Sequence, residues 1–449
     1  MKHSLFAVMV AAAGAAAAGL VPEATFVGAE QGQDNVVRIS YTLANAPAIV
    51  TLDVQTNGED NAWTSIGALN VFGPKCSFVR GANTLVEGNG RHEIEWRPHK
   101  SWAIGGATVG RVRFALKAYA PGNAPDYMAV RLDASVGLSP RVLYFPDAES
   151  LPGGVLGNEE FRKSILLMKR VHAKNMNFDF GDAYTANLPD DETVPSGYRA
   201  VTFPHDYYMG VFELTQKQWE FVHGTTIKSY FKVQGEMRPM ESCTYQQIRE
   251  AAGDSADPEH MYPKPPHPDS FLGKLRTLSG IDDFDLPSEV EWEYAARAGL
   301  PDGYWNDGSV YYGAVETYST FPGRCYLKQA APGTATAASG PENGTAICGS
   351  YTPSRWGFYD FHGNVSEMCL DWTADDVYAL PGNTVNADGA NRVDAPVAGE
   401  KRVARGGGWN SHDVWEYLRL RTHRTLCMIA PGSTSIATGF RVKCRAGLK

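Results

Sequence analysis

The sequence predicts an α+β protein, in which an antiparallel β-sandwich is followed by an irregular domain with few regular elements. Apolar and polar residues alternate over much of residues 36–132, as they do in strands with one buried face. Beyond residue 155 the alternation ends, and helix-capping signals stand among turns rich in Gly, Pro and Asn. The length of 449 residues fits two or three domains, and the hydrophobic content of 43% excludes a disordered chain.

Residues 1–18 have the pattern of a secretory signal peptide. Lys2 is basic, residues 5–18 are apolar, and three alanines precede the predicted cleavage site before Gly19. A buried Ala-rich helix is the alternative, but this segment has no polar face. We therefore expect a secreted or periplasmic protein, with no transmembrane segment after the signal peptide.

Residues 24–137 are predicted to form an immunoglobulin-like β-sandwich. Val37, Ile39 and Tyr41 alternate with polar residues, and similar runs recur between turn signals. This part of the chain shows no catalytic constellation, so spacing, display or partner contact is its expected role. Residues 138–154 are rich in Pro and Gly and are predicted to be a linker before the second domain, residues 155–449.

The second domain contains two helix-capping boxes. Thr215 with Gln218 predicts a helix that ends at Gly224, and Ser288 with Glu291 predicts one that ends at Gly299. The glycines at 406–408 allow the backbone to pass close to a neighbour or to adopt a positive φ.

Charge and cysteine content restrict the function classes. The net charge of −9 and the absence of a Lys/Arg run argue against a nucleic-acid partner. None of the seven cysteines forms a Cys-x-x-Cys pair, which excludes a zinc ribbon. Cys325 and Cys348 flank a loop-like stretch rich in Gly, Ala and Thr, so a disulfide that closes it is one hypothesis and two free thiols are the other.

Six segments of the second domain follow one another in the order of a known set of motifs. They are residues 206–216, 238–242, 286–297, 357–367, 405–410 and 439–442. Together they resemble the formylglycine-generating enzyme family, also called the sulfatase-modifying-factor family. The resemblance implies an irregular C-type-lectin-like domain, which in some secreted bacterial members follows a β-sandwich.

The resemblance also implies a catalytic copper site. Well-known members oxidise a sulfatase cysteine to formylglycine with molecular oxygen, and two cysteines five residues apart hold their Cu(I). The matching positions here are Ser411 and Glu416, whose hard oxygen atoms do not replace the soft thiolates that Cu(I) prefers. Copper is therefore not expected, and we favour a protein without this enzymatic activity.

The same segment is predicted to bind a ligand instead. The candidate residues are Trp409, Ser411, His412, Glu416, Arg419 and Arg421. The arginines, together with Arg405 and Arg424, could hold an anionic group. Alternatively, they pair with acidic residues of the domain itself.

A calcium site is the one metal site that the resemblance supports. Asp360, Gly363, Val365 and Glu367 match family positions that bind Ca²⁺ through two side chains and backbone carbonyl groups. Ca²⁺ takes six to eight oxygen ligands, which such a tight loop can partly supply. The alternative is that these polar side chains cap turns.

Three functional hypotheses follow. The favoured one is an extracytoplasmic module that binds a protein, peptide or glycan, with a sulfatase as one candidate partner. The second is a formylglycine-generating oxidase, or a related oxidase with altered chemistry. The third is a product of a diversity-generating system, in which sister genes would differ near residues 410–424.

Overall fold

The structure is a computed structural model. It describes residues 21–34, 36–57, 63–65, 79–80, 82–98, 111–133, 141–180, 199–224, 229–231, 235–250, 258–260, 262, 264–299, 344–351, 353–361, 363–373, 384–385, 391–392, 401–409, 427–429 and 432–446. The chain divides into two compact units, Met1–Phe161 with Ala446–Lys449, and Arg162–Arg445. The α+β fold class is confirmed, since strands outnumber helices and almost all strand pairs are antiparallel.

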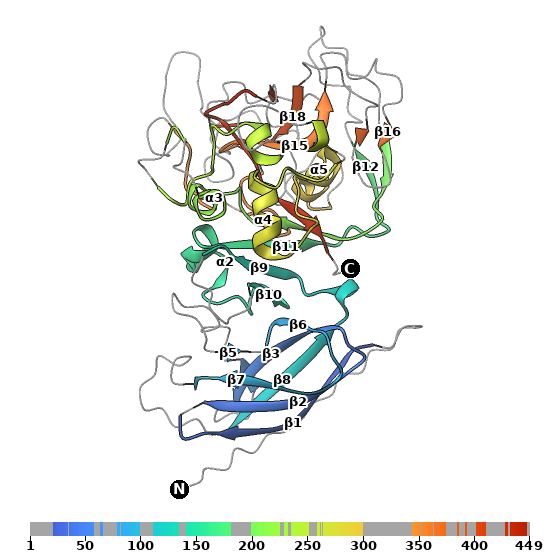
Figure 1. Cartoon of the computed structure of the whole chain (residues 1–449), viewed down its shortest axis with the longest axis vertical. Coiled ribbons are helices and arrows are strands. Elements are labelled where there is room, and N and C mark those ends of the chain that lie inside the picture. Colours follow the sequence, from blue (N-terminus) through green and yellow to red (C-terminus); the bar gives the residue numbers. More distant parts are fainter. Residues whose placement is uncertain are drawn as a thin grey trace, which may run out of the picture. The chain divides into compact units, whose positions relative to one another are not determined.

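Unit 1 contains two antiparallel sheets (Figure 1). The first has the order β1 (Glu23–Gln31), β2 (Val37–Ala44), β7 (Gly90–Trp96), β5 (Val79–Arg80). The second has the order β4 (Trp63–Ser65), β3 (Ala48–Asn57), β6 (Thr84–Val86), and β8 (Val112–Tyr119) also pairs with β3. Ile39 and Ile94 of the first sheet share one buried cluster with Val50 and Phe114 of the second. The alternation of the sequence therefore does form a two-sheet sandwich.

A short strand pair completes the regular elements of unit 1. β9 (Tyr127–Arg131) pairs antiparallel with β10 (Val142–Phe145). A 3₁₀ turn (Pro121–Asn123) precedes the pair, and α2 (Gly154–Gly157) and a 3₁₀ turn (Glu159–Arg162) follow it. β10 lies in the segment that its Pro and Gly residues predicted to be a linker. A strand of four residues shows too little alternation to be recognised among these turn signals.

Unit 2 is built from small sheets. β14 (Tyr207–Gly210) pairs with β11 (Ile165–Val171) on one side and with β21 (Lys443–Arg445) on the other. A second sheet has the order β19 (Cys427–Ile429), β18 (Lys401–Arg405), β15 (Ser366–Thr373), β20 (Thr438–Gly439), in which β20 runs parallel to β15. Two further pairs are β12 (Asn177–Phe180) with β13 (Arg199–Thr202), and β16 (Thr384–Val385) with β17 (Asn391–Arg392).

The helices of unit 2 are short. They are α3 (Gln216–His223), a π-helix η6 (Gln246–Glu250), a 3₁₀ turn η7 (Pro258–His260), α4 (Phe271–Ser279) and α5 (Glu289–Arg297). Both predicted capping boxes are present, at the heads of α3 and α5. α3 ends as predicted at a left-handed Gly224, whereas the left-handed cap of α5 is Ala298, one residue before the expected glycine. None of the described helices is long and apolar enough to cross a membrane.

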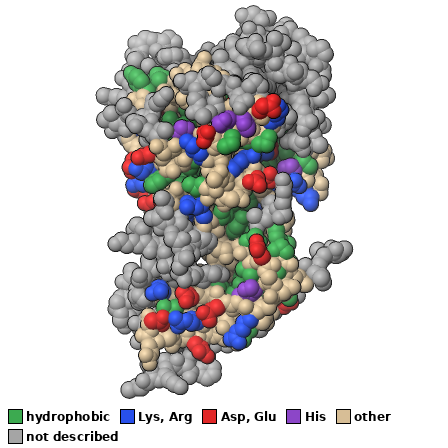
Figure 2. All heavy atoms as spheres, viewed as in Figure 1, with side chains coloured by type: hydrophobic (Ala, Val, Ile, Leu, Met, Phe, Trp, Pro, Cys, Tyr) green, Lys and Arg blue, Asp and Glu red, His purple; other side chains and the backbone are tan. Residues whose placement is uncertain are grey.

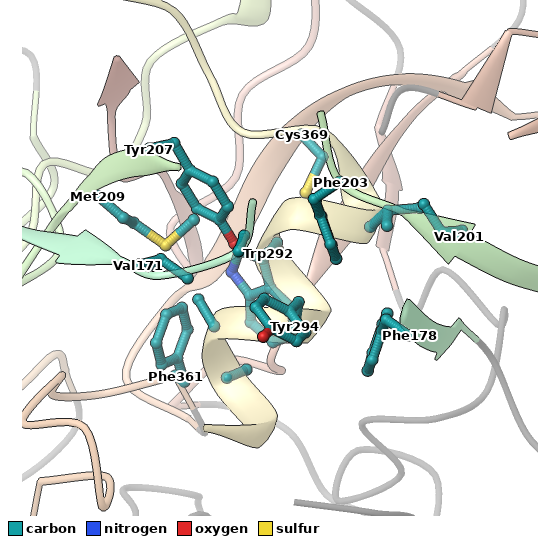
Figure 3. Close-up of a cluster of buried hydrophobic side chains, with 14 of the residues drawn as sticks. Val171, Phe178, Val201, Phe203, Tyr207, Met209, Trp292, Tyr294, Phe361 and Cys369 are labelled. Carbon is teal, nitrogen blue, oxygen red and sulfur yellow. The ribbon is translucent and has the colours of Figure 1, made fainter. Parts of the chain in front are cut away.

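The core of unit 2 packs around α5. Trp292 and Tyr294 of this helix lie among side chains of β11, β12, β13 and β14 and the loop residue Phe361 (Figure 3). Trp292 is fully buried, and its ring meets Phe361 edge to face at 5.2 Å between centroids. Large aromatic side chains thus bury the area that longer sheets or helices would bury in a more regular fold.

Candidate binding surface around Trp409

Three glycines after β18 allow the backbone path that positions Trp409. Gly406 and Gly407 have φ values of +96° and +74°, which residues with a side chain rarely adopt. A Cβ atom at Gly406 would lie 2.6 Å from the carbonyl oxygen of Phe361, and one at Gly408 would lie 2.7 Å from that of Ala437. Only glycines therefore allow the backbone to pass between these two neighbours.

Trp409 belongs to a small apolar cluster with Phe231, Ala346 and Ala437. Its ring packs edge to face on Phe231, with centroids 5.3 Å apart, and Tyr351 packs against the cluster. The indole Nε1 donates a hydrogen bond of 2.9 Å to the carbonyl oxygen of Ile436. Four segments distant in the sequence therefore meet at this tryptophan.

The cluster carries exposed apolar neighbours. Tyr230, Ile347 and Ile436 are each adjacent in sequence to a cluster member, and 69%, 37% and 36% of their surfaces are exposed. We call these three residues with Trp409, Phe231, Ala346 and Ala437 the Trp409 surface.

The described segments that form the Trp409 surface carry no charge. Residues 229–231, 344–351, 406–409 and 432–437 contain no Asp, Glu, Lys or Arg, although one residue in five of the whole chain is charged. Elsewhere on the described surface acidic and basic side chains are interspersed, as the face in Figure 2 shows. These described segments therefore differ in composition from the chain as a whole.

Asn364 joins this surface to the interior. Its side-chain Oδ1 accepts a hydrogen bond of 2.8 Å from the Ala346 amide, and its Nδ2 donates to Glu213 Oε2 at 2.6 Å. Its backbone carbonyl accepts from the amide of Trp409 at 2.8 Å. Asn364 has a φ of +58°, which asparagine tolerates better than most residues.

Three carboxyl groups are buried beneath Asn364, those of Glu213, Asp360 and Glu367. Burial raises the pKa of Asp360 to about 6, although the Gly349 amide and the charge of Arg441 oppose the shift. Burial also raises the pKa of Glu213 well above its ordinary value, and the charges of Asp360 and Glu367 add to this effect. Both shifts favour the protonated form of the carboxyl group.

Glu367 is paired within the fold. Arg441 contacts both of its carboxylate oxygens, with Nε 2.5 Å from Oε2, and Trp292 Nε1 donates to Oε2 at 2.7 Å. Arg441 also donates to the carbonyl oxygens of Gly210 and Tyr359. Such a charge pair with its hydrogen-bonding capacity used internally is a structural element of the core.

This pairing bears on the predicted calcium site. Asp360 Oδ2 accepts from the Gly349 amide at 2.6 Å, and the Glu367 carboxylate is already shared with Arg441. Among the residues that the structure describes, no group of three or more His, Cys, Asp or Glu residues is placed to hold a metal ion. Both carboxyl side chains of the predicted site are therefore already hydrogen-bonded within the fold, and calcium binding stays a prediction.

Four of the described cysteines are free and buried: Cys243, Cys348, Cys369 and Cys444. The predicted Cys325–Cys348 disulfide is wrong, because the Cys348 sulfur lies in the core, 3.5 Å from Glu213 Oε2. Cys325 itself lies outside the described residues. Burial raises the pKa of these four thiols, which favours their protonated form.

The remaining predicted site residues divide into two groups. Arg405 pairs with Glu289 at 2.6 Å and Glu293 at 3.0 Å, both on α5, so its charge is used inside the domain rather than for an anionic ligand. Ser411, His412, Glu416, Arg419, Arg421 and Arg424 lie outside the described residues.

The exposed members of the Trp409 surface were not predicted from the sequence. Tyr230, Ile347 and Ile436 lie in short apolar stretches with no strand or helix periodicity, and exposed apolar residues are common on protein surfaces. Their proximity to Trp409 arises only from tertiary packing.

Comparisons with known proteins agree with the motif order. Residues 173–446 match the sequence model of the sulfatase-modifying factor enzyme 1-like domain. The chain is 32% identical over 158 residues to the formylglycine-generating enzyme of Thermomonospora curvata, which covers 35% of this chain and 48% of that enzyme. The chain thus spans about half the length of that relative.

A second relative is a chaperone rather than an enzyme. The chain is 28% identical over 219 residues to the chaperone protein LppX of Paenibacillus barcinonensis, which covers 46% of this chain and 70% of that protein. Among solved structures, Treponema denticola variable protein 1 aligns with a TM-score of 0.44 and 22% identity, over 63% of this chain and 95% of that one.

Proposed function

Since the chain belongs to the sulfatase-modifying factor enzyme 1-like domain family, we propose that it is a protein-binding member of that family. In this proposal it acts outside the cytoplasm, as the signal-peptide pattern of residues 1–18 suggests. Its Trp409 surface holds an uncharged, apolar segment of another polypeptide.

The exposure of three large apolar side chains around one buried cluster carries the proposal. Tyr230, Ile347 and Ile436 leave apolar area in water that a partner would cover, at about 25 cal/mol per Å² of area removed from water. Grouped exposed apolar residues mark interaction sites more often than scattered ones do. Tyr and Trp next to Ser and Gly are also the composition that antibody binding loops use for protein recognition.

The nature of the partner is supported by one relative. The similarity to a chaperone covers most of that protein's length, and a chaperone by name acts on other polypeptides. The absence of charge from the described segments of the Trp409 surface favours an apolar segment over a strongly charged one.

A formylglycine-generating oxidase is the second candidate, because two bacterial enzymes of that name are 32% and 36% identical to the chain over about a third of its length. Against it, Ser411 and Glu416 stand where the resemblance places the copper-binding cysteines. Cys243, Cys348, Cys369 and Cys444 are buried in the core, away from these two sequence positions.

The proposal is tested by light scattering from heat-denatured citrate synthase, with and without the purified protein. We expect the protein to suppress aggregation, and we expect the triple variant Tyr230→Ser/Ile347→Ser/Ile436→Ser to lose most of this effect. Met176→Ser is the matched control, because Met176 is 48% exposed in the same unit but does not belong to the Trp409 surface. Absence of suppression by the wild-type protein, or equal loss in the control, would overturn the proposal.

The enzyme candidate has its own assay. The protein is incubated with Cu(I), oxygen and a peptide that carries the Cys-x-Pro-x-Arg motif, and the peptide is examined by mass spectrometry. We expect no conversion of the cysteine. Formylglycine formation would replace the binding proposal by the oxidase.

A further inference from the structure

Glu241 is a fully buried carboxylate without a cationic partner among the described residues. Its Oε1 accepts hydrogen bonds from the Ser229 hydroxyl and from the Phe231 amide, the latter at 3.2 Å. Its Oε2 accepts from the hydroxyl of Ser242. Burial of a carboxylate is costly unless donors compensate it, and here neutral donors from two segments do so.

These hydrogen bonds determine how residues 229–231 present their side chains. Ser229 and Phe231 are both tied to Glu241, and Tyr230 between them is the most exposed large apolar residue of the described chain. Phe231 packs inward on Trp409, and the Tyr230 ring stands edge to face on Phe231 with centroids 5.0 Å apart. The carboxylate thus holds one aromatic residue inside and the next one outside.

The neighbouring Ser242 links Glu241 to a second segment of the Trp409 surface. Its backbone has a φ of +58°, an uncommon and strained conformation for serine. Its amide donates to the carbonyl oxygen of Ser435 at 3.0 Å, and residue 436 is the exposed isoleucine of the surface. Glu241 and Ser242 therefore connect the segments that carry Tyr230 and Ile436.

We propose that Glu241 is a positioning residue of the Trp409 surface. It pre-organises residues 229–231 and 435–436 in the geometry that receives the partner. Pre-organisation raises affinity, because fewer rotamers and backbone states are lost when the partner binds. The inference rests on the proposed function only for the identity of the partner, since the positioning itself is measurable in the free protein.

Hydrogen exchange followed by mass spectrometry tests the positioning. In Glu241→Ala we expect about tenfold faster exchange in peptides that cover residues 229–231, since the hydrogen bonds that the Glu241 side chain accepts are lost. Glu241→Gln should restore slow exchange, because its oxygen still accepts from Ser229 and Phe231 and its amide can donate to the Ser242 hydroxyl.

Glu250→Ala is the matched control. Glu250 is equally buried and pairs with Arg402 at 2.6 Å, but neither residue belongs to the Trp409 surface. We expect this variant to be less stable without a selective increase of exchange at residues 229–231. Equal increases in Glu241→Ala and Glu250→Ala, or no rescue by Glu241→Gln, would overturn the positioning role.

Binding measurements separate this inference from the proposed function. The probe is bis-ANS, a dye that reports exposed apolar surface by fluorescence. If Glu241→Ala weakens dye binding at least threefold while Glu241→Gln does not, the positioning role is supported. If exchange responds as expected but no variant changes the suppression of aggregation, the positioning role stands and the proposed function fails.

Discussion

The side-chain amide of Asn364 donates to Glu213 Oε2 across 2.6 Å, and this hydrogen bond connects the Trp409 surface to the buried carboxyl groups beneath it. The same asparagine pairs with the Ala346 amide and accepts from the Trp409 amide, so one residue supports two segments of the surface. Asn364 therefore links both segments to the buried carboxyl group of Glu213.

Replacing Asn364 by Ala is expected to destabilise unit 2 by about 2–4 kcal/mol, because buried polar groups of Glu213 and Ala346 lose their partner. Urea unfolding followed by fluorescence measures the change. Asn175→Ala is the control, since Asn175 also has a positive φ, +64°, but its side chain is exposed. A difference between the two variants below about 1 kcal/mol would contradict the structural role of the amide.

Replacing Arg441 by Met is expected to cost about 3–5 kcal/mol, because Glu367 would remain as an uncompensated buried charge. The comparison is with Lys264→Ala, which breaks an ion pair with Glu259 whose two side chains are 48% and 78% exposed. That exposed pair should contribute less than about 1 kcal/mol. Similar losses in the two variants would show that the Arg441–Glu367 pair is not buried as described.

The raised pKa of Asp360 predicts how stability depends on pH. A pKa of about 6 in the folded state, against 3.8 ordinarily, means that the folded protein binds this proton more tightly than the unfolded chain does. Stability from this group is therefore complete below about pH 4, falls as the pH rises towards 6, and stays lost above that. The shift of Glu213 has the same sign.

Asp360→Asn removes this titration while its amide oxygen still accepts from the Gly349 backbone. In EDTA, the variant should match the wild type at pH 4 and exceed its urea midpoint at pH 7.5. A variant that is less stable than the wild type at pH 7.5 would contradict the assignment.

Calcium binding is tested with the same variant. Because Glu367 forms an ion pair with Arg441, we expect a weak calcium site. At 1 mM, Ca²⁺ should raise the free energy of unfolding by about 0.4 kcal/mol or less, which is the stabilisation that a ligand gives at a concentration equal to its dissociation constant. Thermal melts with EDTA or CaCl₂ measure this. If Ca²⁺ raised the melting temperature by several degrees and Asp360→Asn abolished this rise, the site would be strong. Glu367 would then bind the ion instead of Arg441.

The local features of the fold could be predicted from the sequence because their causes lie within a few residues. Alternation in residues 37–43 produces a strand with one buried face, and the capping boxes at Thr215 and Ser288 form within a single helical turn. The glycines before Trp409 similarly permit a local backbone path. β10 was missed because four residues carry too little periodicity.

The partners of buried polar groups were decided only by the tertiary structure. The sequence offered Arg405 for an anionic ligand and Cys348 for a disulfide, but packing places the first against α5 and the second against Glu213. Which opposite charge a buried side chain meets depends on elements far apart in the chain, so no local pattern encodes it.

The sequence by itself determined the fold class, the starts of α3 and α5 and the family, since these depend on periodicity, capping and motif order. Only the tertiary structure brought Phe231, Ala346 and Ala437, the sequence neighbours of the exposed residues of the Trp409 surface, together at Trp409, and tied Glu241 to Ser229 and Phe231. The physical reason is that an exposed apolar residue has no signature in sequence, and becomes part of a surface only when the backbone segments that carry it are held together.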